Sequence, residues 1–257
     1  MKKKILIIIG IIIILIGLII GAIGLKKYLA EENAGKQYEE LKEEVKKEPE
    51  PPVEEEVVEE EEEPLEIPID FATLTSQYPD VYAWIQIPGT TIDYPIVQRE
   101  GDNDYYLRRS IDGVRKTEGS IFTEDYNSKD FTDPNTVIYG HNMRNGTMFR
   151  QLHNFRDRQF FNENREIIIY QPDRILYYKI FAAYVYDNRH LLLNFDFDDI
   201  NVYRAYLNSV FEKKGMYGNI DGDINVTAED KIITLSTCTG DKSKRYLVQA
   251  VLLSIKE

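Results

Sequence analysis

Cys238 has the most reactive side chain of this sequence, and it is the only cysteine among 257 residues. It follows an apolar run, "KIITL" at residues 231–235, and stands in the stretch "LSTCTGDKSKR". A free cysteine at the end of such a run is most simply a small buried hydrophobe. A thiol beside an imidazole or another cation is instead a nucleophile, because the neighbour favours the thiolate. The question is therefore which residues can reach Cys238.

Three histidines are candidates for its partner. His141 closes "NTVIYGHNM", in which a β-like run ends at Gly140 and delivers the histidine to a rim. His153 lies in "FRQLHNF" at helical spacing beside apolar residues, which predicts a packed helix residue. His190 lies in a loop, where an isolated histidine is usually solvated. His141 is the best partner, because two strand ends on a rigid scaffold can bring residues distant in sequence into contact.

Arg245 follows Cys238 after a turn that contains Gly240 and Asp241, so a hairpin could point its guanidinium back toward the thiol. The three residue types make a complete set for acyl transfer. Cys238 would attack a carbonyl, and His141 would protonate the leaving amine and later deprotonate the incoming nucleophile. Arg245 would donate hydrogen bonds to the substrate or to the developing oxyanion, because it stays charged and offers a fixed fork of donors.

The sequence predicts neither a metal site nor another cofactor. Residues 221–225, "DGDIN", space oxygen atoms like the start of a calcium-binding loop. Val226 then stands where that loop needs glycine, and Ile232 stands where it needs a bidentate glutamate. A polar turn before a strand is the better interpretation.

The elements that must position these residues are mainly strands. Short β-rich runs with local turns favour an antiparallel sheet, closed into a barrel or folded as a sandwich. The runs cover residues 83–87, 92–98, 119–123, 136–139, 166–171, 175–186, 231–237 and 246–255.

Three helical segments accompany the strands. Residues 70–82 have the spacing of a short helix that ends near Pro79, and residues 147–155 form a second short helix. Residues 198–214 predict a longer helix before the cysteine strand, with acids in its first turn, lysines at its end and Gly215 as a stop.

The N-terminus predicts a membrane anchor. Residues 5–25 contain no charged or strongly polar side chain, and at about 1.5 Å per residue they make a helix of about 31 Å, which matches a hydrocarbon core. The lysines before this segment and the acids soon after it favour a cytoplasmic N-terminus and an extracellular remainder. A cleaved signal peptide is the competing interpretation, with residues 22–24 as a weak cleavage site.

The segment that follows is strongly acidic. Residues 26–64 hold six lysines and sixteen glutamates, with four prolines and almost no aromatic residue. Such a composition cannot bury enough surface to fold alone, although residues 38–47 could form a short solvated helix. The acidity argues against nucleic acid as a partner. We therefore divide the chain into an anchor at residues 1–25, a largely disordered stalk at residues 26–66 and a catalytic domain at residues 67–257.

Together, the apolar N-terminal segment, "TVIYGHNM", and "TLSTCTGDKSKR" leading into "YLVQAVL" resemble the sortases. The pattern of that family is a histidine after a strand, then T-L-x-T-C, then an arginine at the start of the next strand. The helix at the start of the domain, Ser236, and the long helix before the cysteine strand are similar to class B sortases in particular. Thr239 departs from some class B relatives, which carry an acidic residue at this position.

The resemblance implies an eight-stranded β-barrel and a single-pass membrane transpeptidase with His141, Cys238 and Arg245 as catalytic residues. It implies cleavage of a C-terminal sorting signal after its threonine, through a thioacyl enzyme, and transfer to an amine of the peptidoglycan precursor. The implied partners are secreted proteins that carry this signal and the cell-wall precursor. Ser236 and Thr237 are the residues that it places in contact with substrate.

Two other classes of protein compete with this interpretation. Papain-like proteases place the cysteine before the histidine and at a helix start, and L,D-transpeptidases carry S-H-G-C at the nucleophile, so neither pattern fits "LSTC". The non-enzymatic alternative is a membrane-anchored surface scaffold in which Cys238 is buried and His141 is hydrogen-bonded in the core. Alkylation of the native protein separates the two, because only an exposed thiol reacts.

Overall fold

The computed structural model describes residues 2–47, 65–214 and 218–257. The chain divides into two compact units, residues 1–41 and residues 42–257. The first unit is helical, and the second unit contains all the strands that the structure describes.

Helix α1 runs from Lys2 to Val45 and holds a segment that is long and apolar enough to cross a membrane. The expectation of a largely disordered stalk is wrong for residues 26–45, because they continue this helix. Oppositely charged side chains four residues apart, such as Glu32 and Lys36 at 3.8 Å, favour the helix. The apolar helix before them also removes the cost of a separate nucleation. Residues 48–64 lie outside the described residues, and the domain division stays a prediction.

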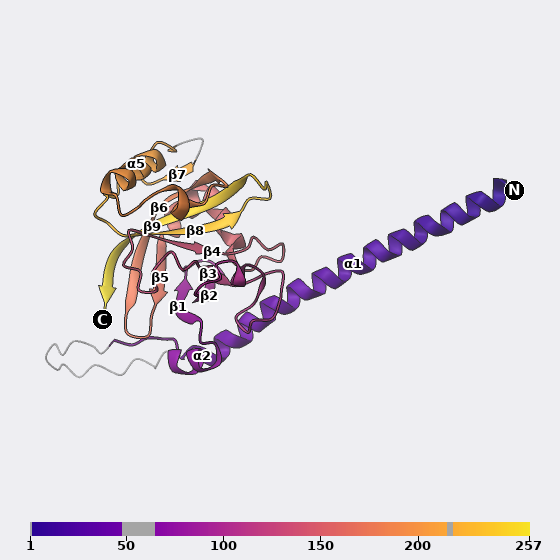
Figure 1. Ribbon diagram of the computed structural model, residues 1–257, viewed down its shortest axis with the longest axis horizontal. Helices are drawn as coiled ribbons and strands as arrows, with labels where there is room; N and C mark the ends of the chain where they lie inside the picture. The colour runs from indigo at the N-terminus through magenta and orange to yellow at the C-terminus, as the bar shows by residue number, and fades with distance from the viewer. Residues whose placement is uncertain (1, 48–64, 215–217) are drawn as a thin grey trace. The chain divides into compact units, whose positions relative to one another are not determined.

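The second unit is a closed β-barrel of eight strands (Figure 1). Its ring follows the order β5-β1-β2-β3-β4-β8-β9-β6, and β6 pairs back onto β5. The short strand β7 (Gly218–Ile220) pairs with β6 outside this ring. All eight predicted runs are strands, and a barrel rather than a sandwich is confirmed. The ring strands are β1 (Val81–Gln86), β2 (Asp93–Val97), β3 (Ile121–Thr123), β4 (Asn135–Tyr139), β5 (Glu166–Tyr170), β6 (Ile175–Asp187), β8 (Ile232–Cys238) and β9 (Lys244–Lys256).

Two pairs of neighbouring strands are parallel, which corrects the expectation of an antiparallel sheet. β2 pairs in parallel with β3, and β4 pairs in parallel with β8. Long connections, residues 98–120 and 140–231, return the chain to the end from which each first strand started. Because parallel strands end at the same edge of a sheet, β4 and β8 deliver His141 and Cys238 to one rim of the barrel.

Helix α5 (Ile200–Phe211) confirms the predicted long helix before the cysteine strand. The Asp199 side chain caps it by accepting hydrogen bonds from the backbone N–H groups of Asn201 and Val202. Its buried residues join one apolar cluster with residues of β6 and β7, and Figure 1 shows α5 beside these strands. Gly215, the expected stop, lies outside the described residues.

The shorter helices differ in detail from the predictions. Helix α2 (Phe71–Gln77) is capped by Asp70 and stops before residue 82, because β1 begins at Val81. The predicted helix over residues 147–155 is a 3₁₀ helix, η2 (Phe149–Arg156), and α3 (Arg158–Glu163) follows it. A further 3₁₀ helix, η1 (Tyr105–Arg108), lies between β2 and β3 and has no signal in the sequence analysis.

The last residues of α1 belong to the barrel unit. Val45 is 1% exposed, and its carbonyl accepts a hydrogen bond from the Asp70 N–H at 2.8 Å. The Lys46 ammonium donates to a carboxylate oxygen of Asp93 at 2.6 Å. A fragment that starts at residue 65 loses these contacts, whereas one that starts at residue 42 keeps them.

We expect the fragment of residues 42–257 to exceed that of residues 65–257 in free energy of unfolding by about 2–4 kcal/mol, mainly through the burial of Val45. Urea titration followed by circular dichroism measures the difference. Lys46→Ala in the longer fragment is the matched control, because it removes the ion pair with Asp93 and the contact with the Trp84 ring but leaves Val45 buried. Equal unfolding midpoints for the two fragments would show that residues 42–47 add nothing to the barrel.

Candidate active site

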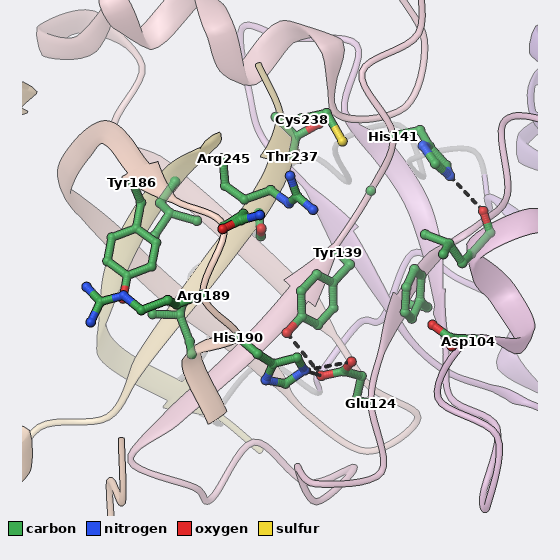
Figure 2. A pocket seen from close by; sticks show the side chains of 17 residues that line it. Asp104, Glu124, Tyr139, His141, Tyr186, Arg189, His190, Thr237, Cys238 and Arg245 are labelled. Carbon is green, nitrogen blue, oxygen red and sulfur yellow. Dashed lines mark hydrogen bonds and ion pairs between the residues drawn. The ribbon is translucent and has the colours of Figure 1, made fainter. Parts of the chain in front are cut away.

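One pocket at the rim of the barrel brings together all five predicted site residues (Figure 2). His141, Cys238 and Arg245 line it, and so do Ser236 and Thr237 of the same strand as the cysteine. Cys238 is exposed, which contradicts the scaffold alternative with its buried thiol. Ser236 and Thr237 are buried, with exposed fractions of 5% and 2%.

The hairpin of β8 and β9 places Arg245 beside the thiol. Cys238 is the last residue of β8, and it is directly opposite Arg245 in the antiparallel register. The turn between them needs Gly240, which adopts φ +95°, and Asp241, whose carboxylate accepts hydrogen bonds from Ser243. The hairpin expected from the sequence is therefore present, and Figure 2 shows the guanidinium next to Cys238.

His141 follows β4 by two residues and is held by a backbone group. Its Nε2 lies 2.6 Å from the carbonyl oxygen of Leu107 in η1. Because a carbonyl only accepts hydrogen bonds, Nε2 carries the proton, and Nδ1 is the nitrogen that remains for the thiol. No residue was predicted to orient His141, because a backbone carbonyl can come from any residue type and is therefore not recognisable in the sequence.

Gly119 allows the Leu107 carbonyl to come close to the chain that precedes β3. It adopts φ +57°, and a Cβ at this position would lie 2.6 Å from the Tyr106 carbonyl oxygen and 2.7 Å from that of Leu107. Both distances are far below van der Waals contact with rigid backbone. The hydrogen bond that orients His141 therefore depends on a glycine at position 119.

Gly119→Ala is expected to destabilise the protein by about 1–3 kcal/mol through strain and clash, and to displace the acceptor of His141. The accompanying loss of kcat/KM should be about tenfold or more, since small misplacements of a catalytic group are costly. Gly101→Ala is the matched control, because Gly101 has a similar φ of +75° but open space at its Cβ. Thermal unfolding and turnover of both variants check the prediction. Equal losses of stability and of kcat/KM in the two variants would contradict it.

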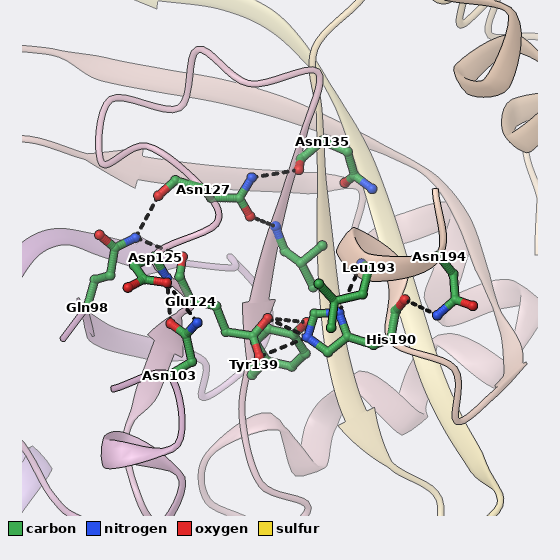
Figure 3. Close-up of polar contacts among 11 residues, drawn as sticks. Gln98, Asn103, Glu124, Asp125, Asn127, Asn135, Tyr139, His190, Leu193 and Asn194 are labelled. Atoms are coloured by element: carbon green, nitrogen blue, oxygen red, sulfur yellow. Dashed lines mark hydrogen bonds and ion pairs between the residues drawn. The ribbon is translucent and has the colours of Figure 1, made fainter. Parts of the chain in front are cut away.

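The opposite wall of the pocket holds a hydrogen-bonded group of Glu124, Tyr139 and His190 (Figures 2 and 3). The Tyr139 hydroxyl donates to Glu124 Oε2 at 3.0 Å, and His190 Nε2 lies 2.7 Å from the same oxygen. His190 Nδ1 accepts from the Leu193 N–H at 3.3 Å and so caps α4 (Leu191–Asn194). Burial, together with Glu124, raises the pKa of Tyr139, so its phenol stays a donor.

The expectation of a solvated loop histidine is therefore wrong for His190. Its partner Glu124 lies directly after β3, and the next residues are fixed by polar contacts that Figure 3 shows. Gln98 Nε2 donates to the carbonyl oxygens of Glu124 and Asn127 at 3.0 and 2.8 Å. The group thus ties α4, from the insertion between β6 and β7, to the barrel wall of the pocket.

A second set of contacts, which was not predicted from the sequence, holds the backbone of Cys238. His153 Nε2 and Asn142 Nδ2 each lie 2.9 Å from the carbonyl oxygen of Cys238. Burial, followed by the nearby Arg156 and Arg150, lowers the pKa of His153, so its imidazole is neutral near pH 7. His153 is a helix residue as predicted, but its polar end contacts the cysteine strand. The helical spacing around it gives no sign of this contact.

The pocket can carry out acyl transfer with groups of the chain itself. It offers an exposed thiol, an oriented imidazole and a guanidinium on adjoining strand ends, together with an apolar wall that includes Leu107, Leu191 and Leu247. Asp221, from the segment weighed as a calcium loop, forms an ion pair with Arg165. Within residues 2–47, 65–214 and 218–257, the structure contains no group of three or more His, Cys, Asp or Glu side chains placed to hold a metal ion.

The closed barrel and its thiol pocket define a cysteine enzyme built on strand ends, and known proteins of this architecture match the chain. The Sortase domain family matches residues 85–253. Sortase B of Listeria monocytogenes is 33% identical over 184 residues, which cover 68% of this chain and 70% of that protein. The crystal structure of Clostridium perfringens sortase B superposes with a TM-score of 0.64 at 34% identity, covering 71% of this chain and 99% of the other. A Staphylococcus aureus sortase B–substrate complex superposes with a TM-score of 0.64 at 28% identity, covering 72% and 84%.

The chain belongs to the sortase family. The relatives above are class B sortases, and the chain is most similar to this class, so it is a class B-like cysteine transpeptidase. The N-terminal helix that could span a membrane is compatible with an enzyme of the cell surface.

Proposed function

We propose that the protein is a single-pass membrane transpeptidase that attaches secreted proteins to the cell wall. It cleaves a C-terminal sorting signal after its threonine and transfers the new C-terminus to an amine of the peptidoglycan precursor. The observation that carries the proposal is the pocket itself. An exposed Cys238 shares it with His141 and Arg245, on the open rim of a barrel where an extended peptide can lie.

The proposed first half-reaction forms a thioester. His141 Nδ1 takes the thiol proton as Cys238 Sγ attacks the threonine carbonyl carbon, and the carbonyl oxygen becomes an oxyanion that Arg245 stabilises with hydrogen bonds. The C–N bond then breaks, and His141 gives this proton from Nδ1 to the leaving amine. The product is a thioacyl enzyme and a free C-terminal fragment of the sorting signal.

The proposed second half-reaction reverses these roles. The precursor amine attacks the thioester carbonyl, and His141 takes the proton that the amine loses. Collapse of the tetrahedral intermediate breaks the C–S bond and returns the thiolate, with a new amide as the product. Ser236 and Thr237 are proposed to contact the peptide, because both line the same pocket beside Cys238.

Arg245→Lys is expected to lower kcat/KM by about 10²-fold, because an ammonium cannot replace the fork of guanidinium donors that meets a developing oxyanion. Steady-state cleavage of a fluorogenic sorting peptide measures the effect. Lys244→Arg is the matched control, since Lys244 is the adjacent exposed residue and forms only a surface ion pair with Asp241 at 3.6 Å. Normal turnover of the Arg245→Lys variant would assign Arg245 to a structural role.

Anchoring is proposed from the first helix. Lys2, Lys3 and Lys4 precede the apolar segment and acids dominate soon after it, so the N-terminus is placed in the cytoplasm and the barrel outside. When protease is added to intact cells, this topology requires that the N-terminus is protected and that the barrel is accessible to the protease.

Mass spectrometry of the barrel fragment tests the proposed reaction directly. Residues 42–257 are incubated with a library of threonine-containing sorting peptides, with and without an amine. A thioacyl adduct on Cys238 that the amine resolves into a new amide supports the proposal. Alkylation of Cys238 without any peptide adduct would show a reactive thiol and a wrong substrate class. No reaction with either reagent would contradict the assignment of Cys238.

A further inference from the structure

The carbonyl oxygen of Cys238 lies where the pairing of two parallel strands ends. β4 and β8 are in register from Asn135 opposite Ile232 to Tyr139 opposite Ser236. The last backbone hydrogen bond on this edge runs from the Gly140 N–H to the Ser236 carbonyl, at 3.1 Å. Alternate carbonyls of a strand face the same neighbour, so the next one toward β4 is that of Cys238. If β4 continued alongside β8, one of its backbone N–H groups would donate a hydrogen bond to the Cys238 carbonyl.

The chain leaves β8 at this point instead. Gly140 fits only because it has no side chain, since a Cβ would lie 2.6 Å from Ile121 and from the ring of Phe149. The His141 carbonyl accepts a hydrogen bond from the Phe149 N–H at 2.9 Å, so this residue pairs with η2 and not with β8. The divergence frees the His141 side chain for the pocket, and it removes the backbone donor for the nucleophile's own carbonyl.

Two side chains take the place of that donor. Asn142 Nδ2 and His153 Nε2 reach the Cys238 oxygen at 2.9 Å each, and the two nitrogens lie 3.0 Å apart because they converge on one atom. His153 is fixed against the Tyr246 ring, with centroids 5.1 Å apart, and Tyr246 lies opposite Thr237 in β9. Neither Asn142 nor His153 is among the described residues that line the pocket.

We propose that Asn142 and His153 are positioning residues that extend the β4–β8 ladder by side-chain hydrogen bonds and so hold the backbone of the nucleophile in place. This inference rests on the proposed function for its kinetic consequence. These two hydrogen bonds let β4 and β8 separate enough to open the pocket while the peptide plane of Cys238 stays fixed. A thiol at the frayed end of a strand would otherwise sample geometries that do not reach the carbonyl of the substrate.

The test uses shape-matched variants that remove one donor each. Asn142→Leu and His153→Phe delete the hydrogen bonds with little change in volume, and the double variant removes both. His153→Gln keeps a donor close to the position of Nε2 and should restore function. Asn154→Ala is the matched control, because Asn154 is the exposed neighbour of His153 on η2.

Each single variant should lower kcat about tenfold and the double variant about 100-fold, with KM unchanged within about twofold, since binding does not involve these residues. The rate of deuterium exchange in residues 236–240 should rise about fivefold in the single variants, which is the effect expected for the loss of one hydrogen bond. His153→Gln and Asn154→Ala should behave like the unaltered protein in both measurements.

The uptake measurement needs no substrate, so the two proposals can fail separately. If no peptide is turned over but uptake rises as expected, the proposed function fails and the positioning role of Asn142 and His153 stands. A double variant with normal kcat, or with uptake unchanged at residues 236–240, would overturn the positioning role. A rise in KM with kcat unchanged would overturn it too, because it would place the two side chains in peptide binding.

Discussion

Cys238→Ala is expected to abolish both cleavage and transfer, with a fall in kcat of at least about 10⁴-fold, because no other residue can form the thioester. The fold should survive. Cys238 is an exposed residue at a strand end, and its side chain fills no part of the core. Thermal unfolding of the variant should therefore match that of the unaltered protein, while peptide cleavage and formation of the new amide both disappear.

Cys238→Ser is the informative companion to this variant. Serine keeps the size and the hydrogen-bonding capacity of the side chain but has a far less acidic hydroxyl, so peptide should still bind while turnover is lost. Fluorescence anisotropy with a labelled sorting peptide measures the binding. Residual turnover near that of the unaltered protein in the alanine variant would rule out a covalent mechanism through this thiol.

His141→Ala is expected to lower kcat by about 10³-fold, within the range of contributions from general acid–base catalysis. The loss has two parts, because the imidazole both favours the thiolate and protonates the leaving amine. The rate of alkylation by iodoacetamide reports the first part alone, and it should fall in the variant. Peptide cleavage reports both parts together.

Added imidazole provides a control for His141. A small imidazole can enter the space left by the alanine substitution and should restore part of the cleavage in a concentration-dependent way. No such rescue is expected for Cys238→Ala. If the His141→Ala variant were alkylated and turned over peptide at the rates of the unaltered protein, the contact between His141 and the Leu107 carbonyl at 2.6 Å would be structural only.

Local patterns in the sequence were enough for the parts of this protein that depend on neighbouring residues. β-rich runs separated by turn residues located all eight barrel strands, and the acidic first turn and terminal lysines of residues 198–214 located α5. The residue types at positions 141, 238 and 245 indicated thiol chemistry, because few combinations of side chains can carry out acyl transfer. The turn residues Gly240 and Asp241 also indicated the hairpin that returns Arg245 to Cys238.

Contacts between distant segments were not predictable in the same way. Helix α1 continues through an acidic segment that by composition alone looked disordered, because helix formation is cooperative along the chain. The parallel pairing of β4 with β8 was missed, since strand direction depends on the path of the connection and not on the residues of the strand.

The environment of the residues that line the pocket, and of the Cys238 backbone, was decided by the tertiary structure alone. The Leu107 carbonyl holds His141, Glu124 holds His190, and Asn142 and His153 hold the backbone of Cys238. The sequence determined which side chains can react, because reactivity belongs to a residue type. The fold decided how they are oriented, because an orienting hydrogen bond needs only a polar atom at the right distance, and many residue types and every peptide group can supply one.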